Sequence, residues 1–368
     1  MSIITIIGSG LMGSAMSVPA GDNGHEVRLV GTPLDREIIR SLREKGQHPT
    51  LPCALPGNIK PFQFEDVRMA LTGADLIICG VSSFGVDWFT EAALPLLPGN
   101  VPVLNVTKGL LGYPDGRLET FPHFFASRRP DISFAAIGGP CTSYELGDRR
   151  QTLVCYCSDN LATARYARDL LKTPYYHIVP TTDVIGVEVS VALKNAFAMG
   201  VSLAIGMSER ENEKQNSVPQ QKNSLISGAH DGKLHYNPQA ALFAQSCIEM
   251  RRLVRLLGGN GDLAGGIPGA GDLYVTIFGG RTRRLGTLLG KGLPYSEVKA
   301  LLANVTLEAV SVITRVAEAL RIRAGRQEVN LQKFPLLLHL DALLNQEAPL
   351  ALDWENFGES GMPEDVCK

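Results

Sequence analysis

The sequence has few cysteines, almost no net charge and no uninterrupted apolar run long enough to cross a membrane. Its seven cysteines are scattered and form no CxxC pair, which argues against a metal site or a disulfide framework and favours reduced thiols. The formal net charge of −2 gives no electrostatic case for a nucleic-acid or anionic-membrane partner. Any anionic ligand must therefore be bound by a local site.

Targeting and membrane signals are also scarce. The longest apolar stretch, Val187 to Met207, carries Glu188 and Lys194 and is interrupted by glycine, so it predicts a buried helix and not a membrane span. The N-terminus shows no basic segment followed by an apolar core and a cleavage site. These features lead us to expect a cytoplasmic protein with no membrane span, and we find no internal repeat.

What the chain does have is enough material for two domains. It has 368 residues, of which 45% are hydrophobic and 20% charged. Short apolar runs alternate with helical segments in the first half, which predicts an α/β, doubly wound Rossmann-type sheet over residues 1–182. The expected strands are Ile3–Ile7, His25–Val30, Asp75–Val81, Val101–Thr107, Ser133–Gly138, Thr152–Ser158 and Tyr175–Val179.

From Val184 onward the periodicity is helical, which predicts an all-α C-terminal domain over residues 183–368. The expected helices are Val187–Met207, Gln239–Leu257, Thr282–Leu289, Tyr295–Leu302 and Thr306–Leu320. A polar run at about 208–236 predicts a loop or a segment on the surface, which is either a substrate lid or a solvated insertion. The tail from Glu347 is expected to be irregular.

A glycine-rich turn follows the first expected strand directly. Gly8, Gly10 and Gly13 have the G-x-G-x-x-G spacing that lets a backbone turn tightly, approach a pyrophosphate and pack a helix against a strand. The following helix N-terminus offers N–H groups to phosphates. Loops after two further strands add a small hydroxyl and a lysine. The predicted cofactor-binding residues are Gly8, Ser9, Gly10, Leu11, Met12, Gly13, Thr32, Ser82 and Lys108.

The second strand does not end in the acid that usually binds the ribose hydroxyls. Gly31 and Thr32 stand at that point, and Asp35 and Arg36 come later. Thr32 and Arg36 are able to accept a 2′-phosphate, so the sequence leaves NAD and NADP equally open as the cofactor.

Polar residues gather at two places in the helical half. Lys194 and Asn195 lie in the middle of an apolar helix, where a buried lysine requires a carboxylate partner or loses its charge. If Asp272 to Thr276 form one helical turn, their side chains share a face. Gly279 and Gly280 then precede Arg281, whose guanidinium suits a phosphate.

Several motifs taken together resemble the NAD(P)-dependent glycerol-3-phosphate dehydrogenase family. They are GSGLMG, VTKGL, IGGPCTSYEL, ALKNAFAMG, YNPQAAL and GAGDLYVTIFGGRTRRLG, in order over roughly residues 1–320. The resemblance implies an oxidoreductase that transfers a hydride between NAD(P)(H) and a polyol phosphate/ketose phosphate pair, foremost glycerol 3-phosphate and dihydroxyacetone phosphate. It also implies a homodimer.

The resemblance further implies roles for particular residues. Lys194 is the general acid/base, with Lys108 beside it, and Asp272 and Thr276 support the catalytic lysine. Asn195, Arg281 and Thr282 take substrate positions, and Glu308 falls at the nicotinamide end of the cofactor.

The sequence departs from the family around the substrate. Thr282 replaces the usual asparagine after the phosphate arginine, Pro238 and Gln239 follow Asn237 where an arginine is expected, and Cys141 replaces a threonine or serine. A related, larger polyol phosphate is therefore a second hypothesis for the substrate. A dehydrogenase of the 3-hydroxy acid or 6-phosphogluconate type and a non-catalytic nucleotide-binding protein remain as alternatives.

Overall fold

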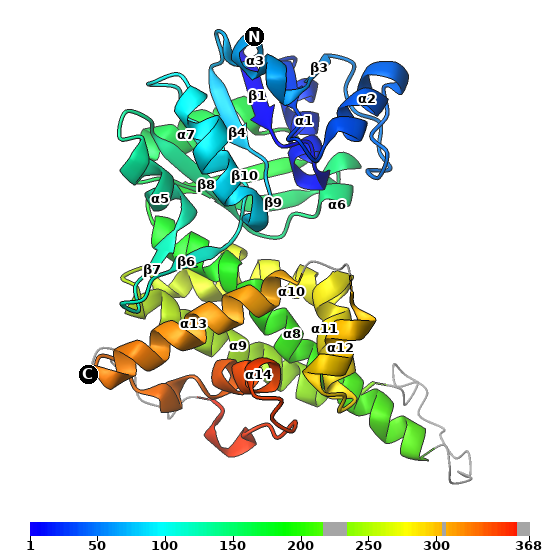
Figure 1. Ribbon diagram of the computed structural model, residues 1–368, viewed down its shortest axis with the longest axis vertical. Helices are drawn as coiled ribbons and strands as arrows, with labels where there is room; N and C mark the ends of the chain where they lie inside the picture. Colours follow the sequence, from blue (N-terminus) through cyan, green and yellow to red (C-terminus); the bar gives the residue numbers. More distant parts are fainter. Residues whose placement is uncertain (216–233, 304–306, 359–368) are drawn as a thin grey trace. The chain divides into compact units, whose positions relative to one another are not determined.

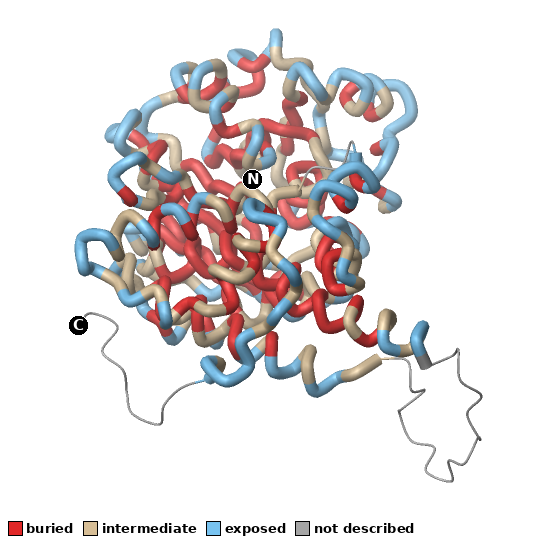
Figure 2. Tube along the Cα trace, turned by 60° about the horizontal axis from the view of Figure 1, so that its bottom comes forward, coloured by how far each residue is buried: buried red, intermediate tan, exposed pale blue. Residues whose placement is uncertain are grey.

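The computed structural model describes residues 1–215, 234–303 and 307–358. The chain divides into two compact units (Figure 1). The first comprises Met1–Leu111, Glu119–Val191 and Gly266–Pro268, and the second comprises Gly112–Leu118, Ala192–Gly265 and Gly269–Lys368. Figure 2 shows the buried segments of the chain, which form the cores, and the exposed segments around them.

The first unit is built on an eight-stranded sheet with the order β10-β9-β8-β5-β4-β1-β2-β3. The strands are β1 Ile3–Ile7, β2 Glu26–Val30, β3 Ile59–Phe62, β4 Leu76–Cys79, β5 Val103–Asn105, β8 Phe134–Gly138, β9 Thr152–Cys157 and β10 Tyr176–Thr181. A separate two-stranded sheet pairs β6 Leu110–Gly112 with β7 Leu118–Thr120.

Strand order reverses beside β1, which pairs in parallel with β2 on one side and with β4 on the other. Such a reversal opens a crevice at the carboxyl ends of the strands, where open α/β sheets bind ligands. The only antiparallel pairing that the described part of this sheet shows is β8 with β9. β10 then pairs in parallel with β9, so the sheet is mixed at that edge.

Helices cover both faces of this sheet. Alternate residues of the strands point to opposite faces, so they pack into two separate hydrophobic cores. One core joins Ile4 and Ile6 of β1 to the helix that follows the glycine turn, and the other joins Ile7 and Ile77 to the aromatic helix before β8. The helices are α1 Leu11–Asp22, α2 Arg36–Lys45, α3 Val67–Leu71, α4 Val86–Trp88, α5 Phe121–Arg128, α6 Ser143–Gly147 and α7 Leu161–Leu171.

The second unit is helical, and its central element is α8, Val184–Gln215. As far as Met207, α8 is mostly apolar and buried, which suits a core helix. It is long and apolar enough to cross a membrane, but 83% of its most apolar window is buried inside the protein. The other helices are α9 Tyr236–Leu256, α10 Asp272–Ile277, α11 Gly280–Gly290, α12 Tyr295–Leu301, α13 Glu308–Gly325 and α14 Pro335–Asn345.

The predicted fold class, a Rossmann-type sheet followed by a helical domain, is confirmed, and each expected strand is present. The two units divide within α8, between Val191 and Ala192, whereas the sequence pattern changes near residue 182. The polar run predicted as a loop begins instead as helix, since α8 continues to Gln215. Residues 216–233 of that run lie outside the described residues.

Candidate functional site

The glycine-rich turn joins β1 to α1 as the spacing predicts. Gly8 has a φ of +108°, and a Cβ there would lie 2.7 Å from the carbonyl carbon of Gly80, at the end of β4. A Cβ at Gly13 would lie 2.0 Å from the carbonyl oxygen of Gly8. At Gly10, by contrast, no described atom lies within 4 Å of a Cβ. Gly8 and Gly13 therefore allow close packing, and Gly10 faces open space.

That open space is a cavity of about 400 Å³ at the carboxyl ends of β1, β2 and β4. Four predicted cofactor residues line it: Gly8, Gly10, Thr32 and Ser82. The side chains of Leu34 and Phe84 also line it and are 95% and 58% exposed, so they offer apolar surface to a planar ring. The other predicted members of the turn, Ser9, Leu11, Met12 and Gly13, belong to the adjoining backbone, outside the lining set.

Although β2 does not end in an acid, a carboxylate from further along the chain reaches the same cavity. Asp35 lines the same cavity, and its Oδ2 accepts hydrogen bonds from the backbone N–H of Thr32 at 2.9 Å and from the Thr32 hydroxyl at 2.9 Å. Arg36, which we considered for a 2′-phosphate, pairs with Glu65 and is not among the lining residues. Sequence position alone missed Asp35 because the loop folds back onto Thr32.

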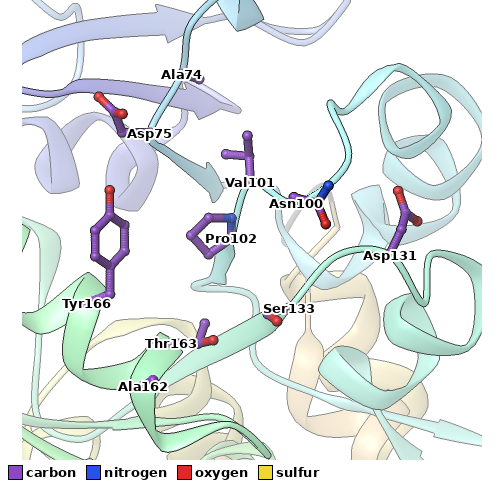
Figure 3. Close-up of a pocket in the computed structure, with 10 residues that line it drawn as sticks. All are labelled: Ala74, Asp75, Asn100, Val101, Pro102, Asp131, Ser133, Ala162, Thr163 and Tyr166. Atoms are coloured by element: carbon purple, nitrogen blue, oxygen red, sulfur yellow. The ribbon is translucent and has the colours of Figure 1, made fainter.

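A second cavity in the first unit, of about 510 Å³, lies at the amino ends of β4, β5 and β8 (Figure 3). Its lining includes Asp75, Asn100 and Ser133, which come just before β4, β5 and β8. Ligands of open α/β sheets bind at the carboxyl ends of strands, not at these amino ends. The smaller cavity is therefore the one at the end of the sheet where such ligands bind.

Lys108 follows β5 and is half-buried, and its Nζ donates a hydrogen bond to the carbonyl oxygen of Gly139 at 3.5 Å. Glu188, in the first turns of α8, is completely buried, and neither carboxyl oxygen has a hydrogen-bond partner among the described residues. Burial raises the pKa of Glu188 well above its usual range, although the positive charge of Lys108 opposes this. The sequence did contain one sign that Glu188 is unusual, because an acidic residue lies there inside an apolar helix.

In the second unit, Lys194 meets the carboxylate that its position requires. Its Nζ donates to Oδ1 of Asp272, and the two side chains are 12% and 0% exposed. Asp272 begins α10, and the hydroxyl of Thr276, one turn later, donates to the carbonyl oxygen of Asp272 at 2.6 Å. The predicted helical turn is thus present, and it places Thr276 one turn after the residue that pairs with Lys194.

The neighbouring residue on α8 makes a second polar pair. Nδ2 of Asn195 donates to Oε2 of Glu308 at 3.1 Å, and Glu308 is the first residue of α13. Successive residues of a helix point about 100° apart, so Lys194 faces α10 while Asn195 faces α13. Two positions taken from the family resemblance, Asn195 and Glu308, therefore lie in contact.

Arg281 and Thr282 lie in the first turn of α11, after Gly279 and Gly280, and Gly280 has a φ of +82°. Arg281 is exposed, and a helix N-terminus adds N–H donors to its guanidinium. α11 crosses α8 closely, since a Cβ at Gly290 would lie 2.1 Å from the carbonyl oxygen of Leu203. This close crossing fixes the helix that carries Arg281 against the helix that carries Lys194.

Comparison with known proteins identifies the family. Residues 3–164 match the family model described as NAD-dependent glycerol-3-phosphate dehydrogenase N-terminus, and residues 222–352 match the one described as its C-terminus. An NADP(+)-dependent glycerol-3-phosphate dehydrogenase from Archaeoglobus fulgidus is 34% identical over 80% of this chain and 82% of its own. A glycerol-3-phosphate dehydrogenase [NAD(P)+] from Moorella thermoacetica is 30% identical over 94% of this chain and 92% of its own.

The fold agrees with solved structures. The crystal structure of a glycerol-3-phosphate dehydrogenase from Coxiella burnetii superimposes with a TM-score of 0.73 and 23% identity, covering 94% of this chain and 95% of the other. A glycerol-3-phosphate dehydrogenase from Saccharomyces cerevisiae gives a TM-score of 0.75 at 16% identity, covering 96% and 97%. On the sequence matches over both halves, the chain belongs to the NAD-dependent glycerol-3-phosphate dehydrogenase family.

Proposed function

We propose that the protein catalyses the NAD(P)-dependent interconversion of glycerol 3-phosphate and dihydroxyacetone phosphate. The buried Lys194–Asp272 pair carries this proposal, because the residue to which the family resemblance gives the acid/base role has a buried carboxylate partner. A protein that only senses nucleotides does not need such a pair, since burying two charges costs several kcal/mol per ion.

The first unit fits a dinucleotide. The cavity of about 400 Å³ falls in the usual range for small-ligand sites, and a Cβ at Gly10 would project into open space where a backbone must approach a pyrophosphate closely. We assign Gly8, Ser9, Gly10, Leu11, Met12 and Gly13 to the pyrophosphate, Thr32 and Ser82 to the adenosine half, and Lys108 and Glu308 to the nicotinamide end. A bound nicotinamide supplies or accepts the hydride.

The chain's own residues manage the proton. In the reducing direction the Nζ of Lys194 carries a proton that it donates to the carbonyl oxygen of the substrate, and in the oxidising direction neutral Nζ takes the hydroxyl proton. Asp272 holds that ammonium in place, and Thr276 is one turn from Asp272 on α10. Lys108 is assigned a place beside the reacting oxygen.

Arg281, Thr282 and Asn195 are assigned to the substrate. The exposed guanidinium of Arg281 and the first N–H groups of α11 suit a phosphate, because both present donors in fixed directions. The amide of Asn195 is held by Glu308, which leaves its oxygen able to accept a substrate hydroxyl.

Three residues that differ from the family pattern support a second candidate substrate. Thr282 is smaller than the asparagine usual in the family, and Pro238 and Gln239 stand where an arginine is expected. Both changes make room around the substrate, so a four- or five-carbon ketose phosphate is the second candidate.

The test is a matrix of initial rates. Dihydroxyacetone phosphate and a panel of four- and five-carbon ketose phosphates are each reduced with NADH and with NADPH. We expect the highest kcat/KM with dihydroxyacetone phosphate and measurable rates with at least one cofactor. A clear preference for a longer ketose phosphate would replace the substrate, and no turnover with either cofactor would contradict the proposed activity altogether.

We also propose that the protein acts in the cytoplasm as a homodimer. The six cysteines within the described residues are free thiols, as suits a reducing compartment. Light scattering coupled to size-exclusion chromatography measures the mass against the 39.7 kDa of one chain. A mass near one chain at micromolar concentration would contradict the dimer.

A further inference from the structure

The peptide groups on both sides of Ser9 are held by side chains from outside the glycine motif. The Ser9 N–H donates to Oδ2 of Asp35 at 3.1 Å. The Ser9 carbonyl oxygen contacts Nε2 of His48 at 3.1 Å and accepts from the Ser14 hydroxyl at 2.9 Å. Ser9 is the residue between the first two glycines of the turn, so these contacts act on the segment that must fit a pyrophosphate.

The hydrogen bonds of His48 determine where its proton lies. Nδ1 accepts the backbone N–H groups of Thr50 at 3.1 Å and Leu51 at 2.9 Å. An atom that accepts two N–H groups carries no hydrogen, so the single ring hydrogen of neutral His48 is on Nε2 and is donated to Ser9. His48 is 6% exposed, so water does not replace these partners freely.

Asp35 joins the same turn to the neighbouring strand. The oxygen that accepts from Ser9 also accepts the N–H and the hydroxyl of Thr32, which follows β2. One carboxylate thus ties the loop after β1 to the loop after β2. These are the loops whose residues line the cavity, including Gly8, Gly10, Thr32 and Asp35.

We propose that His48 and Asp35 are positioning residues for the dinucleotide, and that together they clamp the Ser9 backbone so that the glycine-rich turn is preformed for the pyrophosphate. The proposal rests on the dinucleotide-binding function of this cavity. It has a physical reason: a glycine-rich turn has many accessible conformations, and fixing them in advance removes an entropy cost that binding would otherwise carry.

The clamp is sensitive to protonation of His48. A second ring hydrogen on Nδ1 would point at the N–H groups of Thr50 and Leu51, and both hydrogen bonds would be lost. Burial lowers the pKa of His48, while the bond to Ser9 and the charge of Asp35 raise it in part. Asp35 is the charged group that faces His48, and Ser9, Thr50 and Leu51 face it with uncharged groups. Cofactor affinity should therefore fall on the acid side.

The test measures the Kd of NADH and NADPH for the full-length protein by the fluorescence of the reduced nicotinamide. For His48→Ala we expect the Kd of the preferred cofactor to rise at least tenfold, with the KM of the ketose phosphate changed less than twofold. His48→Gln retains an N–H donor for Ser9 and should recover most of the affinity. It should also remove the loss of affinity that the unaltered protein shows as the pH falls below 6.5.

A matched control is available in the same sheet. His25 has the same bonding pattern, because its Nδ1 accepts the N–H of Ser2 at 3.2 Å and its Nε2 contacts the carbonyl oxygen of Leu170 at 3.0 Å. It immediately precedes β2, at the amino end of that strand and not at the glycine turn. His25→Ala should lower the melting temperature about as much as His48→Ala does, and it should leave the cofactor Kd unchanged.

The outcomes separate the two levels of the proposal. If the unaltered protein binds neither NADH nor NADPH, the dinucleotide-binding function fails. If it binds and His48→Ala binds within twofold, the clamp alone is overturned. Should His48→Ala not fold, Asp35→Ala decides, because it removes the group that accepts the Ser9 N–H: a raised cofactor Kd supports the clamp, and a Kd within twofold of the unaltered value overturns it.

Discussion

Among single residues, Lys194 is the one on which the proposed chemistry most depends. The sequence predicted that a lysine in an apolar helix either has a carboxylate partner or loses its charge, and the structure shows the partner, the buried Asp272. The pairing itself was foreseen only from the family resemblance, because Asp272 is far along the chain and belongs to another helix. Burial and chemistry predict that a partner exists, but only the fold says which one it is.

We expect Lys194→Ala to lower kcat by about 10²–10⁴-fold, since a positioned acid/base contributes on that order. Cofactor Kd should stay within twofold, because the glycine turn lies in the other unit. Removing the lysine also breaks a buried ion pair on one side, which costs about 3–5 kcal/mol of stability. The double variant Lys194→Met with Asp272→Asn removes both partners of the pair and should fold normally while remaining inactive.

Lys291 serves as the matched control for this change. It too lies in the second unit and forms ion pairs, with Glu209 at 2.9 Å and Glu213 at 3.1 Å, but these pairs are near the surface. Lys291→Ala should leave kcat unchanged. Turnover in Lys194→Ala within a few fold of the unaltered rate would show that another group moves the proton.

The roles of His48 and Asp35 could not be predicted from the sequence, for a physical reason. His48 lies in a loop with no periodicity, and Asp35 comes after the position where a ribose-binding acid is expected. Each acts through backbone groups of Ser9 and Thr32, and backbone hydrogen bonds leave no pattern of residue types behind them. Glu188 did leave a signal, as an acid within an apolar run, but its neighbourhood to Lys108 depends on how β5 and α8 pack.

At the scale of elements, strong periodicity predicted well and short elements were missed. The sequence predicted β1 with the same bounds and α9 within three residues at each end, but the predicted α8 ends at Met207, eight residues before the helix does. β3, Ile59–Phe62, was not foreseen because it has only four residues and contains Pro61, which removes a ladder donor and suits an edge strand. α14 was missed because PLLLHLDALLN is apolar with almost no polar face to reveal a helical period.

The glycine turn gives a prediction that separates folding from binding. Gly10 has a φ of −63°, which alanine adopts without strain, and a Cβ there meets no described atom within 4 Å. A Cβ at Gly13 would lie 2.0 Å from the carbonyl oxygen of Gly8. We expect Gly10→Ala to keep the free energy of unfolding within about 1 kcal/mol while weakening cofactor binding at least tenfold.

Gly13→Ala should instead destabilise the protein by about 1–3 kcal/mol, since backbone atoms have to move to admit the methyl group. Denaturant unfolding followed by circular dichroism, together with cofactor titration, measures both quantities for both variants. Normal cofactor affinity in Gly10→Ala would mean that the cavity at this turn does not receive the pyrophosphate.

On the scale of the whole molecule, each unit holds a buried carboxyl group whose pKa is raised, among the residues that the structure describes. Glu188 is in the first unit and Glu249, on α9, is in the second. Burial raises the pKa of Glu249 to about 7, although Gln245 and the N–H groups of Leu336 and Leu337 donate to it at 2.7–2.8 Å. Glu249 thereby joins α9 to the start of α14.

These groups make stability fall as the pH rises. A carboxyl whose folded pKa lies above its unfolded value of 4.5 contributes stability that is present below pH 4.5 and is lost as the pH rises through the folded pKa. For Glu249, a difference from 4.5 to about 7 corresponds to roughly 3 kcal/mol. Between pH 5 and 7.5 the free energy of unfolding of the unaltered protein should fall. This fall should be about 2–3 kcal/mol smaller in Glu249→Gln, and it should also be smaller in Glu188→Gln.

Asp22 provides the contrast. Its hydrogen bond from Arg149 lowers its pKa below 3.8, so its contribution is present above that pH and is lost only as the pH falls further. Asp22→Asn should therefore leave the slope between pH 5 and 7.5 unchanged. An altered slope in Asp22→Asn, or an unaltered one in Glu249→Gln, would contradict the account.

The double variant Glu188→Gln with Glu249→Gln tests whether the units unfold together. α8 is one continuous helix that contributes Val184–Val191 to the first unit and the rest to the second, so unfolding either unit frays the core helix of both. We expect a single denaturant transition in which the two changes in pH slope add, as they do for independent sites in one cooperative structure. If two transitions appear, and each substitution shifts only the transition of its own unit, then α8 does not couple the units and each must be assigned a stability of its own.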